Sequence, residues 1–89
     1  MKVLFFAYIR DYTGEKETEV QCSGTVFELL EALCLKYGSK FENIVFKDKK
    51  LSDQIIVLVN GRHISHIGGV NASLNKDDVI SIFPVVAGG

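Results

Sequence analysis

The stretch TVFELLEALCLKYG, residues 25–38, is the clearest helix signal in the chain. Thr25 is followed three residues later by Glu28, the spacing of a capping box, in which each side chain accepts a hydrogen bond from the other residue's backbone N–H. Gly38 is suited to end the helix, because glycine readily adopts the conformation found just beyond a helix C-terminus. Between these ends, apolar residues recur at the spacing of one helix face; they are Val26, Leu29, Leu30, Leu33, Cys34 and Tyr37. The pattern predicts one amphipathic helix with an apolar face to bury.

Two strand-like segments precede this helix. Residues 2–10, KVLFFAYIR, are rich in aromatic and branched side chains, and residues 17–22, ETEVQC, alternate with more polar positions. Thr13-Gly14 lies between them and marks a turn. Together these segments predict a β-hairpin whose second strand lies at a sheet edge.

Further strands are expected after the helix. Residues 55–59, IIVLV, are followed directly by Asn60-Gly61, a strong hairpin signal. Residues 62–64 are expected to form a short return strand. Residues 79–83, VISIF, form the last strand, which we expect Pro84 to end, since proline cannot donate to a sheet ladder.

This order of elements predicts the fold class. A hairpin, one main helix and further strands indicate an α+β domain in which the helix covers one face of a mixed sheet of four to five strands. This is the β-grasp, or ubiquitin-like, arrangement. We expect residues 1–83 to form the domain and residues 84–89 to form a flexible tail.

One feature does not fit a sheet covered on one face only. Such a sheet should alternate apolar and polar residues, but Leu4 and Phe6 are apolar on the side of the first strand opposite Val3 and Phe5. Two interpretations stay open. Residues 39–54 could fold over the second face, as a short helix around Phe41, Ile44 and Val45 with a polar loop over 47–54. Alternatively, the second face is an exposed patch that binds a partner.

Composition excludes several classes of function. Of the 89 residues, 47% are hydrophobic and 24% charged, as in ordinary globular domains, and the net charge of −1 argues against nucleic-acid binding. No apolar run approaches the ~20 residues that span a membrane, and the N-terminus lacks a signal peptide, so we expect a cytoplasmic protein. Cys22 and Cys34 are expected to be reduced structural residues, with a disulfide or a sulfur-relay role as the alternatives. No set of metal ligands is predicted.

The sequence ends in Ala87-Gly88-Gly89. Two residues without side chains can enter a narrow channel that larger residues would block. An α-carboxylate at Gly89 would be ionised at neutral pH, because its reference pKa is about 3.3–3.7. We therefore expect the carboxylate to be the working group, and an ordinary frayed terminus is the alternative.

The body and the tail together resemble the MoaD/ThiS family of sulfur carriers, and are most similar to its MoaD branch, the small subunits of molybdopterin synthase. The resemblance rests on the opening VLFFA followed by Gly14, the helix over 25–38, the strand that ends in Asn60-Gly61, the turn Asp77-Asp78-Val79, and the terminal FPVVAGG. Val85 stands where many members have a second proline, and Asn75-Lys76-Asp77 replaces the usual Asp-Gly-Asp type of turn.

The resemblance implies a cycle of chemistry at Gly89. A partner adenylating enzyme would use ATP and Mg²⁺ to activate the carboxylate, and a sulfur donor would then convert it to a thiocarboxylate. The tail would insert into the large subunit of molybdopterin synthase, with which the chain would form a heterotetramer. There it would deliver sulfur to a cyclic pterin precursor. On this reading the chain is a non-catalytic subunit that binds no cofactor itself. The residues expected to contact partners are Phe6, Phe83, Pro84, Val85, Val86, Ala87 and Gly88.

Three other functions share parts of this pattern. A ThiS-like carrier would deliver sulfur for thiamine synthesis. A ubiquitin-like modifier would be conjugated through Gly89 to lysines of other proteins. A plain interaction domain would carry an inert tail.

Overall fold

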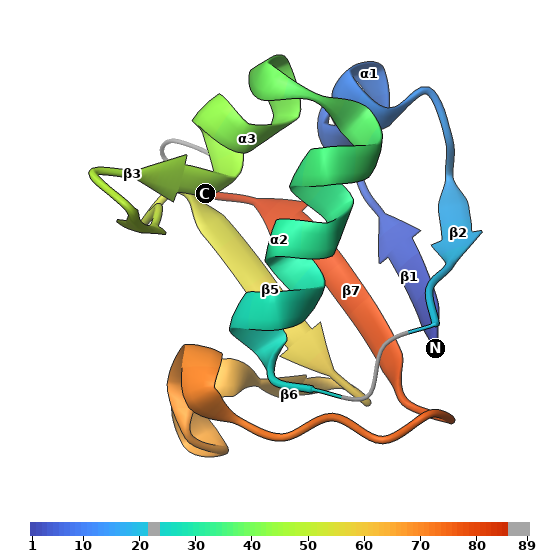
Figure 1. The fold of residues 1–89 in the computed structure, drawn as a ribbon, viewed down its shortest axis with the longest axis vertical. Helices are drawn as coiled ribbons and strands as arrows, with labels where there is room; N and C mark the ends of the chain where they lie inside the picture. The colour runs from blue at the N-terminus through green and yellow to red at the C-terminus, as the bar shows by residue number, and fades with distance from the viewer. Residues whose placement is uncertain (22–23, 86–89) are drawn as a thin grey trace.

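A mixed sheet carries the fold of this protein (Figure 1). The computed structural model describes residues 1–21 and 24–85. In this part of the chain the main sheet has five strands in the order β2-β1-β7-β5-β6, in which β1 and β7 are parallel and the other pairs are antiparallel. The strands are β1 Lys2–Phe5, β2 Glu17–Glu19, β5 Ile55–Val59, β6 Arg62–His63 and β7 Val79–Pro84. The predicted β-grasp architecture is confirmed.

The main helix, α2 Val26–Tyr37, forms as the sequence predicts. The Thr25 hydroxyl accepts a hydrogen bond from the Glu28 backbone N–H at 3.2 Å, and the Thr25 N–H donates to Glu28 Oε1 at 3.3 Å. Gly38 ends the helix with a φ of 95°, and its N–H donates to the Cys34 carbonyl at 2.8 Å. The capping box and the glycine therefore fix both ends of the helix.

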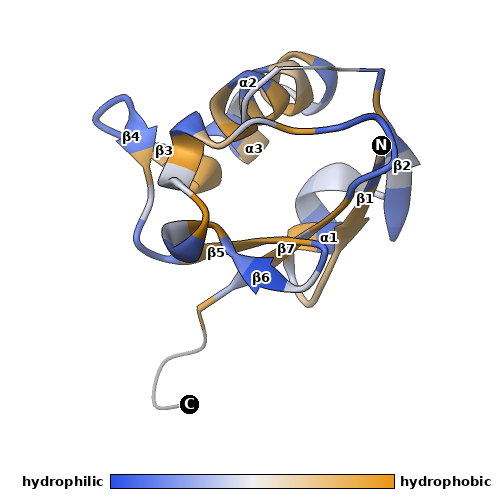
Figure 2. Ribbon diagram, turned by 90° about the horizontal axis from the view of Figure 1, so that it is seen from below, coloured by the Kyte–Doolittle hydropathy of each residue, from blue (hydrophilic) through white to orange (hydrophobic). Residues whose placement is uncertain are grey.

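A second helix, α3 Ser39–Val45, follows at once and packs on the same side of the sheet as α2 (Figure 2). Phe41 and Val45 are fully buried in the same core as the apolar face of α2. The short helix expected near Phe41 is thus confirmed, but the interpretation that residues 39–54 cover the second sheet face is wrong. Burying these two side chains beside α2 enlarges one core instead of building another.

The first strand is shorter than predicted. It ends at Phe5, and Ile9 and Arg10, which were expected to extend it, begin the helix α1 Ile9–Thr13. Ala7 turns the chain with a φ of 53°, after which Ile9 enters the core and Gly14, with a φ of 74°, ends the helix. A helix this short leaves no periodic signal that distinguishes it from an apolar strand.

Several other boundaries also differ from the predictions. The segment 47–54, expected to be a loop, contains strand β4 Lys50–Leu51, which pairs with β3 Phe46–Lys47. The predicted return strand stops at His63 and continues as the 3₁₀ turn η1 Ile64–His66, and a second such turn, η2 Gly69–Asn71, follows. Strand β2 ends at Glu19, before the predicted end at Cys22, which lies outside the described residues.

Candidate functional site

Strand β7 is the described element nearest in the sequence to the terminal glycines. Strand β7 runs one residue beyond its predicted end, because Pro84 lies opposite Ile55 and is buried. The Val85 N–H then donates to the Gln54 carbonyl at 2.8 Å, so the hydrogen bonds to the β5 side continue past the strand itself. The sheet therefore holds the chain through Val85.

The position of Pro84 explains why a proline is tolerated in a central strand. Backbone groups of alternate β7 residues point toward β1, as the bond from the Phe6 N–H to the Ile82 carbonyl at 3.1 Å shows. The missing N–H of Pro84 falls on that side, two residues further on, where β1 has already ended at Phe5. The proline thus costs the sheet no ladder hydrogen bond.

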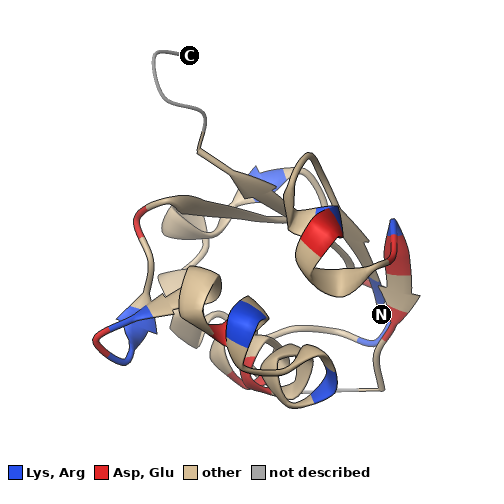
Figure 3. Cartoon of the chain, turned by 90° about the horizontal axis from the view of Figure 1, so that it is seen from above, with Lys and Arg blue, Asp and Glu red and all other residues tan. Residues whose placement is uncertain are grey.

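The sheet face away from α2 and α3 is lined by half-buried side chains, most of them apolar. We call it the open face, and it consists of Leu4, Phe6, Ile56, Leu58, Ser81 and Phe83. Figure 3 shows that β5 and β7 carry no charged residues, whereas α1, α2, β2 and the β3–β4 hairpin do. An apolar strip of this kind on a small domain is typical of a binding surface.

Two aromatic rings dominate the open face at the end near the tail. Phe6 and Phe83 stack face to face, with ring centroids 4.2 Å apart and planes 7° apart. Ile56 is the cross-strand neighbour of Phe83 on its other side. This row of three side chains crosses the sheet beside the point where β7 ends, so a partner that docks on it also lies beside the start of the tail.

Arg10 adds a positive charge at the rim of the open face. Its Nε donates to the Phe5 carbonyl at 2.9 Å, and its guanidinium lies 5.9 Å from the centre of the Phe6 ring. Arg10 was not among the predicted site residues, because its place beside Phe6 depends on the unexpected helix α1. The only sequence signal for a site at Arg10 was its position shortly after the aromatic residues of the first strand.

The structure places three of the predicted partner-binding residues together. Phe6, Phe83 and Pro84 lie at one end of the sheet, and Val85 follows directly. The other predicted site residues lie outside the described residues; they are Val86, Ala87, Gly88 and Gly89.

Cys34 is a buried residue of α2. Burial, followed by the charges of Glu42 and then Glu31, raises the pKa of its thiol to about 11. A thiol that stays protonated at neutral pH is a poor nucleophile, which favours the structural role predicted for this residue. Among the described residues, no group of three or more His, Cys, Asp or Glu side chains could hold a metal ion, and no helix there is long and apolar enough to cross a membrane.

The fold and this site together define a class of protein. A β-grasp domain with an apolar open face and a last strand that leads to a Gly-Gly sequence is a ubiquitin-like carrier domain. The chain belongs to the ThiS family, whose profile matches residues 3–89, within the ThiS/MoaD group of ubiquitin-like sulfur carriers.

The proteins similar to this chain carry names of several kinds. Small archaeal modifier protein 3 of Haloferax volcanii is 32% identical over all of this chain and 98% of its own length. A chain of the Amycolatopsis orientalis BexX/CysO complex is 30% identical, with a TM-score of 0.86 over 99% of this chain and 98% of that one. A Pyrococcus furiosus protein assigned as molybdopterin converting factor, subunit 1, is 29% identical, with a TM-score of 0.72 over 96% and 95% of the two chains.

Proposed function

We propose that this protein carries sulfur as a thiocarboxylate at Gly89, after a partner enzyme has adenylated the Gly89 carboxylate. The observation that carries the proposal is the pairing of the open face with the end of β7. The Phe6–Phe83 stack offers a docking surface at the end of β7, where Val85 is hydrogen-bonded to Gln54. Membership of the ThiS family, with a match that extends to residue 89, supports the same role.

The chemistry follows from the poor reactivity of a carboxylate. Attack of a carboxylate oxygen on the α-phosphorus of ATP forms an acyl-adenylate and releases pyrophosphate, with Mg²⁺ bound by the partner enzyme. A persulfide sulfur then attacks the acyl carbon, a C–S bond forms, and AMP leaves. A thiol reductant cleaves the S–S bond and leaves the thiocarboxylate, a softer nucleophile than the original carboxylate.

The geometry sets the reach of this group. Four residues follow Val85, and fully extended they would span about 13 Å. The active site of a partner docked on the open face should therefore lie within about that distance of Val85. The small side chains of Ala87, Gly88 and Gly89 suit a narrow channel, and the negative charge at the tip suits one lined by Lys or Arg.

Intact-mass spectrometry tests the carrier role. The untagged protein would be incubated with an adenylating enzyme, ATP, Mg²⁺, a persulfide donor and a thiol reductant. We expect a mass increase equal to the exchange of one oxygen for sulfur, located at Gly89 by fragmentation. An unchanged mass with an enzyme that charges another ThiS-family protein in parallel would contradict the proposal.

For the sulfur acceptor, we propose a cyclic pterin precursor that is converted to molybdopterin in the cytoplasm. On this proposal the chain is the small subunit of molybdopterin synthase and forms a heterotetramer with the large subunit. The Pyrococcus furiosus relative supports this assignment. Formation of the dithiolene from charged protein, large subunit and precursor would test it, and charged protein that yields none would contradict it.

A second candidate is conjugation to other proteins. The similarity to a Haloferax volcanii modifier protein over the whole chain favours it, since activation of the Gly89 carboxylate serves both outcomes. Isopeptide bonds between Gly89 and lysines of cellular proteins would support this candidate. ThiS-like delivery of sulfur for thiamine synthesis would instead be revealed by transfer to a thiazole-forming enzyme.

A further inference from the structure

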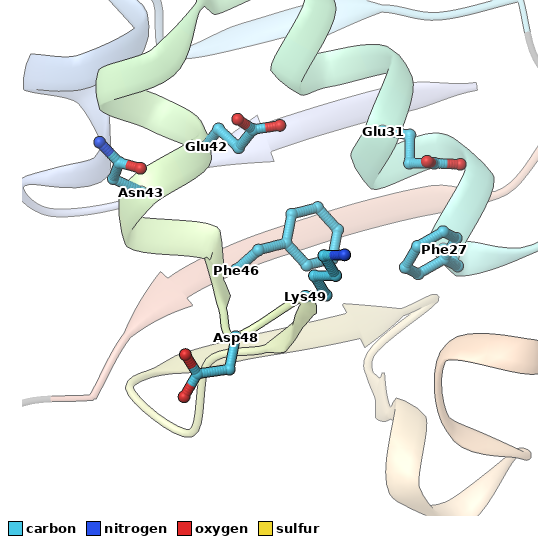
Figure 4. A pocket seen from close by; sticks show the side chains of 7 residues that line it. All are labelled: Phe27, Glu31, Glu42, Asn43, Phe46, Asp48 and Lys49. Atoms are coloured by element: carbon cyan, nitrogen blue, oxygen red, sulfur yellow. The ribbon is translucent and has the colours of Figure 1, made fainter.

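A hollow of about 460 Å³ lies on the helix side of the sheet, opposite the open face (Figure 4). It is formed between α2, α3 and the β3–β4 hairpin. Phe27 from α2 and Phe46 from β3 supply its apolar surface, with ring centroids 5.5 Å apart and planes inclined by 60°. Both rings are only half-buried, so part of their surface is available to a ligand.

Carboxylates surround these two rings. Glu31, Glu42 and Asp48 line the hollow together with Asn43 and one cation, Lys49. Within residues 1–21 and 24–85, none of the three carboxylates lies within ion-pair distance of a basic side chain. The negative potential of Glu42 and Glu31 extends inward, since both raise the pKa of the Cys34 thiol after the larger effect of burial. The hollow therefore combines aromatic surface with unpaired negative charge.

The surface beside the hollow continues along the outer face of α2. Phe27, Glu31 and Leu35 follow one another at one-turn intervals, and Leu35 is 89% exposed. The distance from Phe27 to Leu35 along the helix axis is about 12 Å. A ligand that fills the hollow can therefore gain apolar contact at Leu35 only if it is as long as a short peptide.

We propose that this surface binds a segment of a partner protein that places an arginine in the hollow and an apolar residue against Leu35. A guanidinium is weakly hydrated, stacks on aromatic rings and pairs with carboxylates through two parallel hydrogen bonds, which matches the rings and the acids here. An extended chain advances about 3.3 Å per residue, so the two anchors should be four residues apart. Because the open face lies on the other side of the sheet, this partner and the one that handles the tail can bind together.

Titration of the full-length ¹⁵N-labelled protein with two probe peptides tests the proposal. The probes are acetyl-Arg-Ser-Gly-Ser-Leu-amide and its reversed sequence, each with a version in which citrulline replaces arginine. We expect at least one arginine peptide to shift the amide signals of the outer face of α2 and of residues 46–49. Its citrulline version should bind at least five-fold more weakly, because it keeps the shape but loses the charge.

Variants separate the hollow from general attraction to acidic surface. E31Q combined with E42Q should weaken binding at least five-fold, whereas E17Q combined with E19Q removes the same charge from β2 and should change it less than two-fold. F46L should also weaken binding, and its spectrum reports whether the fold is retained. Charging at Gly89 should be unchanged in all of these variants, so this proposal and the carrier role can fail separately.

Four outcomes would overturn the proposal. They are the absence of shifts with both arginine peptides at millimolar concentration, shifts of equal size around β2, equal losses in the two double variants, and shifts that depend on protein concentration without peptide. The last outcome would show that a second copy of this chain occupies the surface.

Discussion

The Asn60 side chain ties Asp78 to the start of β7. Its Nδ2 donates to Asp78 Oδ1 at 2.8 Å, and its Oδ1 accepts a hydrogen bond from the Val79 N–H at 2.9 Å. Asp78 Oδ2 in turn accepts from the Asn75 N–H at 2.8 Å. The Asn-Gly and Asp-Asp-Val motifs, which are separate in the sequence, thus form one structural connection at the end of the sheet opposite the tail.

Replacing Asn60 should therefore destabilise the domain. Asn60→Ala removes two side-chain hydrogen bonds and places alanine at a φ of 51°, so we expect a loss of about 1–3 kcal/mol in the free energy of unfolding. Asn60→Gly relieves the backbone but not the hydrogen bonds and should cost less. Urea denaturation measures both variants. Asn75→Ala is the control, since only its backbone takes part, and an equal loss there would contradict this role for the Asn60 side chain.

The Phe6–Phe83 stack should control partner affinity. Phe6→Glu places a charge on the open face, and we expect KM for adenylation to rise at least ten-fold with little change in kcat. The fold should be retained, because Phe6 is only half-buried. Asn71→Glu adds the same charge in the exposed turn η2 and should leave KM unchanged. Equal effects of the two variants would show that net charge, and not the open face, determines binding.

The position of Gly89 should be as important as its identity. Adding one alanine after Gly89, or deleting Gly89, should abolish thiocarboxylate formation, because the reacting carboxylate moves relative to the docked sheet. Thermal unfolding should be unchanged, because Gly89 has no side chain that could contribute to the core. Normal charging of the extended protein, seen by intact-mass spectrometry, would contradict the carrier mechanism.

Stability should fall in alkaline solution. The pKa of Cys34 is raised from 9.0 to about 11, mainly by burial, and that of Tyr37 from 10.0 to about 12 by burial and its hydrogen bond to Glu15. The unfolded chain releases these protons at lower pH than the folded protein, so the stabilisation is complete below about pH 9 and is lost between about pH 9 and 12. Cys34 alone should account for up to about 3 kcal/mol.

Denaturant unfolding at a series of pH values checks this expectation. Cys34→Ala should flatten the decline between about pH 9 and 11, and Tyr37→Phe should flatten it at higher pH. If the pH dependence of Cys34→Ala matched that of the unchanged protein, the buried thiol would not be its source.

Local sequence patterns were sufficient for much of the fold. The Thr25–Glu28 capping box, the helix stripe and Gly38 predicted α2 with both of its ends, because these signals act between residues close in the chain. The apolar, branched runs in 55–59 and 79–83, bounded by Asn60-Gly61 and Pro84, predicted the central strands for the same reason. The order of these elements then left few arrangements other than the β-grasp fold.

The errors arose where distant contacts outweighed local preference. Residues 6–10 look like a continued strand, but the turn at Ala7 and the burial of Ile9 make α1. Strand β4 exists only because its two residues pair with β3. Neither segment is long enough to carry a periodic signal of its own.

The sequence by itself determined the class of this protein, through its helix, its strands and its Gly-Gly sequence. Only the tertiary structure decided which sheet face stays open, since that depended on whether Phe41 and Val45 would join the core beside α2. It also brought Arg10 to Phe6, and Phe27 to Phe46, across elements that the sequence separates or misassigns. Binding surfaces arise from such contacts between distant residues, and these form only when the chain folds to bury its apolar side chains.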